Sequence, residues 1–186
     1  MSNQKSFLPV RELCATALGA ALMTICAWIS IPAQVPFTLQ TFAVFFVTAL
    51  LGLRCGTLSV IVYLLLGAVG LPVFAGFQGG LGSLLGVTGG YLLGFMFSAL
   101  AVGLMTKFLG RSFPVLIASM IVGLVLCYAF GSAWFQILYI RTKGAITTGA
   151  VLSACVLPYL IPDAIKIALA AILVRRLQPH VSLAKA

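Results

Sequence analysis

The sequence predicts an all-α integral membrane protein with six transmembrane helices. Of its 186 residues, 62% are hydrophobic and 7% are charged, whereas a soluble domain carries about 25% charged residues. Apolar runs of about 20 residues, the length that crosses the hydrocarbon core of a bilayer, recur along the chain. The basic residues lie in short segments between these runs, as in membrane proteins. We therefore expect lipid to surround a single six-helix domain that covers residues 1–186.

The six expected spans follow one another along the chain. The first apolar run is longer than the roughly 7–15 residues of a signal-peptide core, and no convincing cleavage site follows it, so we expect it to be a span. The later runs are set apart by proline, glycine or basic residues. The expected limits are Leu13–Ile31, Phe37–Leu53, Gly56–Phe74, Thr88–Phe108, Pro114–Ile140 and a last stretch that ends near Val174.

Positive charge is distributed unevenly between the two sides of the predicted bundle. An even number of spans places both termini on one side, and lysine and arginine are enriched in cytoplasmic segments. Only Arg141 and Lys143 fall on the side opposite the termini. The distribution predicts cytoplasmic termini in a cell membrane, and it makes the net charge of +9 a topology signal rather than a nucleic-acid surface. The cations on the side of the termini are Lys5, Arg11, Arg54, Lys107, Arg111, Arg175, Arg176 and Lys185.

Cofactor chemistry has little support in the sequence. The five cysteines are dispersed without a C-x-x-C pair, and the single histidine, His180, lies in the C-terminal tail. This pattern predicts neither a disulfide framework nor a metal site. The chain also lacks a G-x-x-x-x-G-K-[ST] loop, so it does not hydrolyse ATP by that mechanism. We expect no cofactor, and active uptake would require partner subunits.

The first span carries small residues at four-residue spacing. Ala15 pairs with Gly19 in this pattern, and Ala17 pairs with Ala21. Such spacing lets another helix approach closely. The pattern is compatible with packing inside the bundle and with docking against another membrane subunit.

Two segments on the outer side depart from plain helices. The segment Gly67–Gly94 holds ten of the nineteen glycines and no charged residue. Non-helical backbone at membrane depth is tolerated where protein or a cavity surrounds it, so we expect this loop to fold over the outer end of the bundle. A flexible surface loop is the alternative. Thr38 and Gln40 enter the second span on the same side, where they would contact a ligand or a neighbouring helix.

The sixth apolar stretch contains Asp163 and Lys166, one helical turn apart. Pro162 is favoured at the first position of a helix, which predicts a final helix from about Pro162 to Arg175. That helix would be roughly 20 Å long, shorter than the hydrocarbon core, so Asp163 would lie in its outer half. The preceding TTGAVLSACVLPYL would form a separate short helix or a re-entrant segment. Charged groups at this depth usually mark a binding site, and a structural ion pair is the alternative.

Four stretches of the sequence resemble a known family. VPFTLQTFAV, GLPVFAGFQGG, TGGYLLGF and PDAIK are similar to segments of the BioY family, the biotin-binding S components of energy-coupling factor (ECF) transporters. One departure is GVTGGY, in which a proline is expected before the threonine. The resemblance implies an S-component-like bundle with a glycine-rich outer loop. It further implies a prokaryotic substrate-binding subunit that captures biotin outside and delivers it inward with a transmembrane coupling subunit and two ATPase subunits, and that is not itself an enzyme.

The resemblance and the chemistry of biotin together suggest roles for individual residues. Asp163 would accept a ureido N–H, and Lys166 would donate to the ureido carbonyl or to the ligand carboxylate. In family S components, small residues like those of the first span dock onto the coupling subunit. The predicted ligand contacts are Asp163, Lys166, Thr38 and Gln40, with Gln78 and the backbone of Gly79 and Gly80 near the carboxylate and with Phe74, Phe77 and Tyr91 as apolar walls.

Three other functions remain open at this level. An S component for a different vitamin or small solute would have the same fold and another preferred ligand. An intramembrane enzyme could use Asp163 as acid or base, but no second catalytic group lies in a span, and Glu12 is at the opposite end. A scaffold would bind no small molecule.

Overall fold

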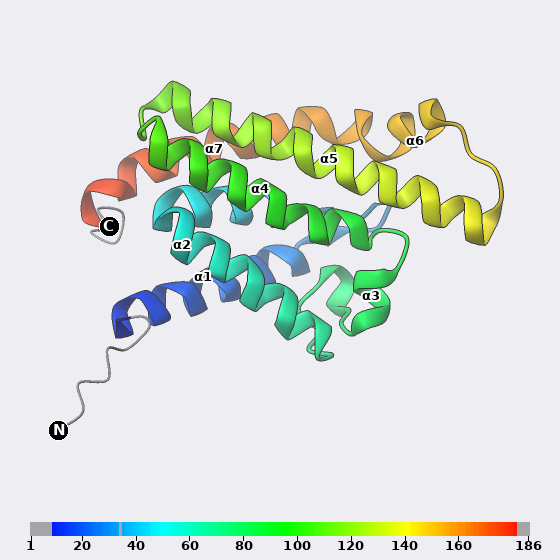
Figure 1. Cartoon of the computed structure of the whole chain (residues 1–186), viewed down its shortest axis with the longest axis horizontal. Coiled ribbons are helices and arrows are strands. Elements are labelled where there is room, and N and C mark those ends of the chain that lie inside the picture. Colours follow the sequence, from blue (N-terminus) through cyan, green and yellow to red (C-terminus); the bar gives the residue numbers. More distant parts are fainter. Residues whose placement is uncertain (1–8, 34, 182–186) are drawn as a thin grey trace.

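The computed structural model describes residues 9–33 and 35–181, which form a bundle of helices elongated along one axis (Figure 1). Short 3-10 turns, η1 to η3, lie at Ala75–Phe77, Leu157–Tyr159 and Gln178–His180. Two short strands, β1 (Ser30–Ile31) and β2 (Phe37–Thr38), pair in antiparallel fashion after the first helix. The helices are α1 (Val10–Trp28), α2 (Gln40–Ala68), α3 (Leu81–Leu85), α4 (Gly89–Phe108), α5 (Phe113–Lys143), α6 (Thr148–Cys155) and α7 (Leu160–Leu177).

Five helical segments in the described part of the chain are long and apolar enough to cross a membrane. They are α1, α2, α4, α5 and the run of elements from Thr148 to His180 that contains α7. The second of them, α2, contains most of both ranges expected for spans two and three, which are joined by a turn at Gly52. Since α2 turns back on itself, as described next, the six-crossing topology stays a prediction.

Helix α2 is a hairpin of two helical arms, residues 40–51 and 53–68. Gly52 has φ 87° and ψ 179° between them. Beyond this turn Gly56 lies so close to Thr48 that an added Cβ would approach the Thr48 Cα to 2.5 Å. The amide of Gln40 at the start of the first arm donates to the hydroxyl of Tyr63 in the second. In a straight helix these two residues would be about 35 Å apart, so the arms run antiparallel.

Arg111 secures the hairpin turn from the link between α4 and α5. Its guanidinium donates to the carbonyl oxygen of Leu50 at 3.3 Å, which satisfies one carbonyl that the end of the first arm leaves without an intrahelical partner. A Cβ at Gly52 would lie 2.9 Å from the same guanidinium. The turn therefore requires both the backbone freedom of glycine and the absence of a side chain.

Replacing Gly52 by alanine is expected to destabilise the protein. The observed dihedral angles lie in a region that is essentially restricted to glycine, and such strain is worth about 1–3 kcal/mol. The melting temperature of the detergent-solubilised variant should fall by several degrees. Gly149→Ala is the matched control, because Gly149 is helical and has open space around its Cα. An unchanged melting temperature for Gly52→Ala would contradict the assigned role of the turn.

Several predicted boundaries move in the structure. The third span was expected to reach Phe74, but α2 ends at Ala68 and the chain then turns at Gly70, where φ is 101°. The glycine-rich segment is not wholly irregular, since it includes η1 and the short α3. The last helix begins at Leu160, so Pro162 lies in its first turn. Of the two alternatives expected for the preceding segment, the structure has the separate short helix, α6.

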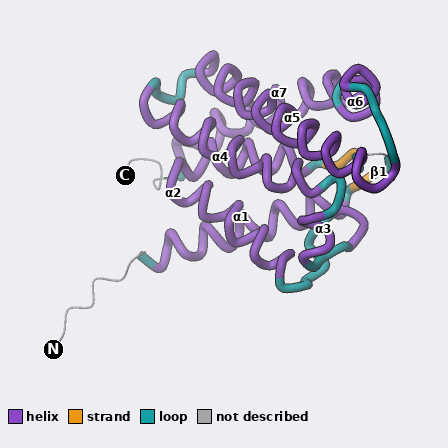
Figure 2. Tube along the Cα trace, turned by 45° about the vertical axis from the view of Figure 1, so that its right-hand side comes forward, coloured by secondary structure: helices purple, strands orange, loops and turns teal. Residues whose placement is uncertain are grey.

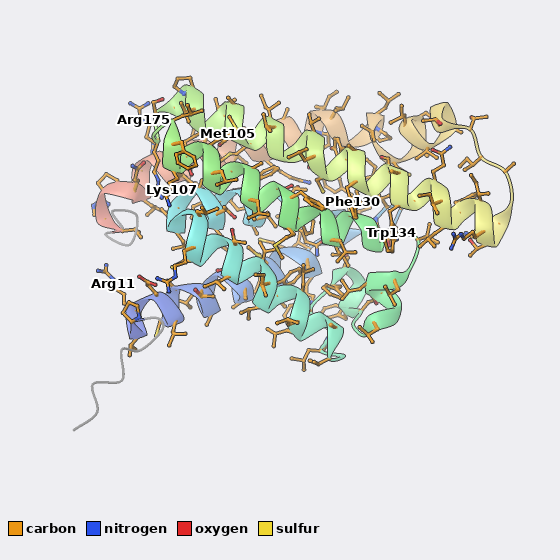
Figure 3. All side chains as sticks on the ribbon, viewed as in Figure 1. Arg11, Met105, Lys107, Phe130, Trp134 and Arg175 are labelled. Carbon is orange, nitrogen blue, oxygen red and sulfur yellow. The ribbon has the colours of Figure 1, made fainter. Side chains whose placement is uncertain are left out.

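The two ends of the bundle differ in charge and in irregular structure. The start of α1 and the end of α7 lie at one end, where Figure 3 labels Arg11, Lys107 and Arg175. We call this the basic end. Figure 2 shows β1, α3 and α6 grouped at the opposite end, which we call the loop end. Lys5 and Lys185, which contributed to the predicted orientation, lie outside the described residues.

Candidate functional site

A cavity lies among the segments of the loop end. It offers about 90 Å³ to the centres of water molecules, which is room for several waters or for part of a small organic ligand. Its walls come from the 35–41 segment, the 74–78 loop, and helices α3 to α7. The lining residues are Val35, Pro36, Thr38, Gln40, Thr41, Phe74, Ala75, Gln78, Ser83, Thr88, Tyr91, Leu92, Phe95, Cys127, Tyr128, Cys155, Tyr159, Asp163 and Lys166.

The Asp163–Lys166 pair lies in the wall of this cavity. The lysine Nζ donates to Oδ1 of the aspartate at 2.7 Å. Asp163 is 3% exposed and Lys166 is 5% exposed. Because the two residues are one helical turn apart in α7, they share a face of the helix, as their spacing predicts. The pair is buried inside the bundle and does not face lipid.

Three side chains from other elements complete the surroundings of this pair. Thr41, in the first arm of α2, donates to Asp163 Oδ1 at 3.0 Å. Tyr128, in the middle of α5, donates to Asp163 Oδ2. The ammonium of Lys166 lies 3.3 Å from the Thr41 hydroxyl and 4.3 Å from the centre of the Phe37 ring. A buried ion pair is stable only with such additional hydrogen bonds, so these contacts hold both charges in place.

The predicted contacts Thr38 and Gln40 line the same cavity. Thr38 donates to Oε1 of Gln40 at 2.9 Å, and Nε2 of Gln40 donates to the hydroxyl of Tyr63. The side-chain amide therefore keeps one N–H and one acceptor position beyond these two bonds. Tyr91 also lines the cavity, and its hydroxyl is bonded to Ser132 at 3.1 Å.

The predicted contacts in the glycine-rich loop divide into two groups. Phe74 and Gln78 line the cavity, and the backbone N–H of Phe74 donates to the carbonyl of Gln78. Phe77 does not line it: the residue is 63% exposed, and the centre of its ring lies 5.1 Å from the centre of the Trp28 ring on α1. The backbone turns at this residue, with φ 57°, and this turn directs the side chain outward.

Gly79 and Gly80 are also absent from the cavity wall. The N–H of Gly80 already donates to the carbonyl of Gly67 at 2.7 Å. A Cβ at Gly79 would meet the carbonyl oxygen of Leu71 at 2.2 Å, so this residue packs against the loop itself. The N–H of Gly80 is therefore used within the loop, and the expectation that the Gly79 N–H meets a ligand stays a prediction.

The small residues of α1 face in two directions. Gly19 packs against the second arm of α2, where an added Cβ would lie 2.5 Å from Oγ of Ser59. Ala15 is half-buried, while Ala17 and Ala21 are exposed on the outer face of the helix. The Ala15–Gly19 step therefore belongs to packing within the bundle, and only the Ala17–Ala21 step is open to a partner.

Sequence reasoning missed three residues that contact the ion pair: Thr41, Tyr128 and Phe37. Thr41 directly follows Gln40, which was singled out, but on a helix the two point in different directions. Tyr128 lies within the apolar run GLVLCYAFG. A tyrosine in such a run needs a partner for its hydroxyl, and this need was the available signal. Its partner, Asp163, is 35 residues away in the chain.

Comparisons with known proteins agree with the fold and with the motifs. Residues 1–183 match the BioY family. The chain is 42% identical over 170 residues to "Biotin transporter BioY" of Thermotoga maritima, covering 91% of this chain and 96% of the relative. It is 37% identical over 172 residues to "Probable biotin transporter BioY" of Pyrococcus horikoshii, covering 92% and 98%. The crystal structure of the S-component for biotin from an ECF-type ABC transporter matches with a TM-score of 0.81 at 28% identity, covering 96% of this chain and 95% of that one. The chain therefore belongs to the BioY family.

Proposed function

We propose that this protein is the biotin-binding membrane subunit of an ECF-type uptake transporter and that the cavity at the loop end holds the ligand. The observation that carries the proposal is a buried Asp163–Lys166 pair in the wall of that cavity, held by Thr41 and Tyr128. Relatives named as biotin transporters and the similar biotin S-component support biotin as the ligand. In this role the chain binds and releases its ligand without catalysing a reaction.

The hydrogen-bonding capacity left on the pair matches a ureido group. Oδ1 of Asp163 accepts from Thr41 and Lys166, while Tyr128 is the one donor to Oδ2 in the part of the chain that the structure describes. A carboxylate oxygen accepts about two bonds, so Oδ2 can take one N–H from a ligand. The ammonium of Lys166 has three N–H groups and uses two on Asp163 and Thr41. We therefore assign the ureido N–H to Asp163 and the ureido carbonyl to Lys166.

The rest of the ligand then extends away from α7. Phe74, Tyr91 and Phe95 offer apolar surface for the thiophane ring and the valeryl chain. Three partly or fully exposed polar side chains, Gln78, Ser83 and Thr88, line the cavity on the glycine-rich side. We assign the ligand carboxylate to this group, in place of the backbone of Gly79 and Gly80.

Binding of biotin to the purified protein tests the proposal directly. Isothermal titration of the detergent-solubilised protein should show one saturable site for biotin. Desthiobiotin, which keeps the ureido ring, should compete, whereas a vitamin without a ureido group, such as riboflavin or thiamine, should not. Preference for another vitamin would support the alternative of a different S component. No binding of any vitamin would support a scaffold.

Two phenylalanines of the same loop provide a matched test of the cavity wall. Phe74→Ala removes a buried ring from the wall and from an edge-to-face contact with Tyr63 at 5.4 Å. Loss of such a contact should weaken biotin binding roughly tenfold or more. Phe77→Ala removes an exposed ring outside the cavity, so the affinity should stay within about twofold of wild type. Biotin titration of both variants measures the two affinities. Equal losses of affinity would contradict the assignment of Phe74, and not Phe77, to the cavity wall.

We further propose that the exposed Ala17–Ala21 step of α1 docks onto the transmembrane coupling subunit. Close approach of two membrane helices requires small side chains at the contact. Ala21→Trp should therefore prevent co-purification of the coupling subunit and abolish ATP-dependent uptake, while biotin binding by the isolated chain is preserved. Leu65→Trp, at an exposed position on α2, is the control. Normal assembly of the Ala21→Trp variant would rule out this surface.

The orientation predicted from the charges completes the proposal. The basic end would face the cytoplasm and the loop end would face the outside, where biotin is captured. Labelling of single cysteines introduced at Lys143 and at Gln178 with a membrane-impermeant maleimide in intact cells tests this orientation. Only the cysteine at position 143 should react from outside.

A further inference from the structure

A second recess lies at the basic end, away from the ligand cavity. It is a groove between the start of α5 and the last turns of α7, lined by Phe113, Ile172, Arg175 and Arg176. None of these residues lines the ligand cavity. Arg175 is twelve residues beyond Asp163 on the same helix, which separates the two places by about 18 Å along the axis.

The groove combines two guanidinium groups with apolar walls. The guanidinium carbon of Arg175 lies 5.9 Å from the centre of the Phe113 ring, a distance at which a cation–π contact orients the side chain. The chain has only two acidic residues. These form ion pairs with Arg54 and Lys166, so neither neutralises the arginines of the groove. Among the described residues no carboxylate pairs with these adjacent arginines, which favours an anion, and guanidinium groups match phosphate oxygens in geometry.

The position of the groove favours a lipid as the source of that anion. Ile165, Leu169 and Ile172 are exposed on α7. Their spacing of four and three residues, continued by Arg176, places all four on one face of the helix. An acyl chain can therefore lie along this stripe while its phosphate meets the arginines at the end. Basic pockets between membrane helices bind anionic headgroups in this way.

We propose that the groove formed by Phe113, Ile172, Arg175 and Arg176 binds the phosphodiester headgroup of an anionic phospholipid. The site is independent of biotin binding and is expected to anchor the basic end of α7 at the membrane surface. Two arginines near an anionic headgroup are expected to favour phosphatidylglycerol over the zwitterionic phosphatidylcholine by roughly tenfold or more.

Native mass spectrometry of the delipidated full chain, titrated with dioleoyl phosphatidylglycerol or dioleoyl phosphatidylcholine, tests the site. The wild type should bind one molecule of phosphatidylglycerol in preference to phosphatidylcholine. Arg175→Gln/Arg176→Gln should lower that affinity roughly tenfold. The control Arg141→Gln/Lys143→Gln removes the same charge at the loop end and should change the affinity by less than about threefold. Arg175→Lys/Arg176→Lys, which keeps the charge, should retain most of the affinity, and biotin titration checks that each variant is folded.

Four outcomes would overturn the proposal. Equal losses of phosphatidylglycerol affinity in the Gln variants at the two ends would show that net charge alone, and not the groove, attracts the lipid. Equal affinity for the two lipids would remove the headgroup preference. Saturation of the groove by millimolar inorganic phosphate, seen as a rise in melting temperature that the Arg175→Gln/Arg176→Gln variant lacks, would make a free anion the ligand. A photo-crosslinker at Ile172 that captures a protein and no lipid in native membranes would make the groove a protein interface.

Discussion

Lys166→Ala is expected to weaken biotin binding by roughly 100-fold. Removing the ammonium takes away the proposed donor to the ureido carbonyl, and a hydrogen bond to a charged group contributes about 1.5–3 kcal/mol. It also leaves the carboxylate of Asp163, 3% exposed, without its cation. Breaking a buried pair by removing one partner costs about 3–5 kcal/mol of stability. Both effects are measured on the purified variant, as biotin affinity and as the melting temperature.

A charge-free double variant separates binding from folding. Asp163→Asn/Lys166→Gln keeps the approximate shape of the pair and leaves no charge buried alone, so its melting temperature should recover toward wild type. Biotin affinity should stay as low as in the single variants, because the two residues bind the ligand as a unit. Lys143→Ala, at an exposed position of the loop end, is the control. Wild-type affinity in Lys166→Ala would refute the assigned site.

Tyr128→Phe is expected to weaken biotin binding roughly tenfold. Its hydroxyl is the one donor to Oδ2 of Asp163 among the described residues, and this bond turns the carboxylate toward Lys166 and the cavity. A charge-assisted bond of this kind contributes about 1.5–3 kcal/mol, part of which the incoming ligand replaces. Tyr139→Phe on the same helix removes a hydroxyl outside the cavity wall and should leave the affinity unchanged.

The effect of Tyr128 should depend on Asp163. If the tyrosine acts by orienting the carboxylate, Tyr128→Phe should cause little further loss in an Asp163→Asn background, giving a coupling of about 1 kcal/mol or more in a double-mutant cycle. Full additivity of the two losses would show that Tyr128 contacts the ligand independently, and it would contradict the positioning role. Biotin titration of the four proteins supplies the measurement.

The helices were largely predictable because their length is set by the bilayer. Apolar runs matched α1, α4 and α5 to within a few residues, since hydropathy is a property of neighbouring residues in the chain. The hairpin in α2 was less predictable. Its two arms were recognised as separate spans, but the break was placed between Leu53 and Gly56, whereas the chain turns at Gly52. Arg111, which secures that turn, is 61 residues from the carbonyl that it binds.

The site was predictable only in part, because some of its contacts join residues that are distant in the chain. Spacing alone placed Asp163 and Lys166 on one helix face, and proline placed them near the start of α7. The contact of Asp163 with Thr41 joins residues 122 positions apart, so no local pattern indicates it. Which residues of the glycine-rich loop line the cavity could not be predicted, because the direction of Phe74 and Phe77 depends on the backbone turn at Phe77 and on the bond between Gly80 and Gly67.

By itself the sequence determined a helical membrane protein of the BioY family with a charged pair in its last helix. Hydrophobicity, residue spacing and short motifs carry that information, and all three are read along the chain. Only the tertiary structure decided that Thr41 and Tyr128 complete the pair, that Phe77 and the two glycines lie outside the cavity, and that Gly19 packs inward while Ala21 stays exposed. These outcomes depend on which helix faces meet, and that is settled by side-chain packing and hydrogen bonding between segments distant in the chain.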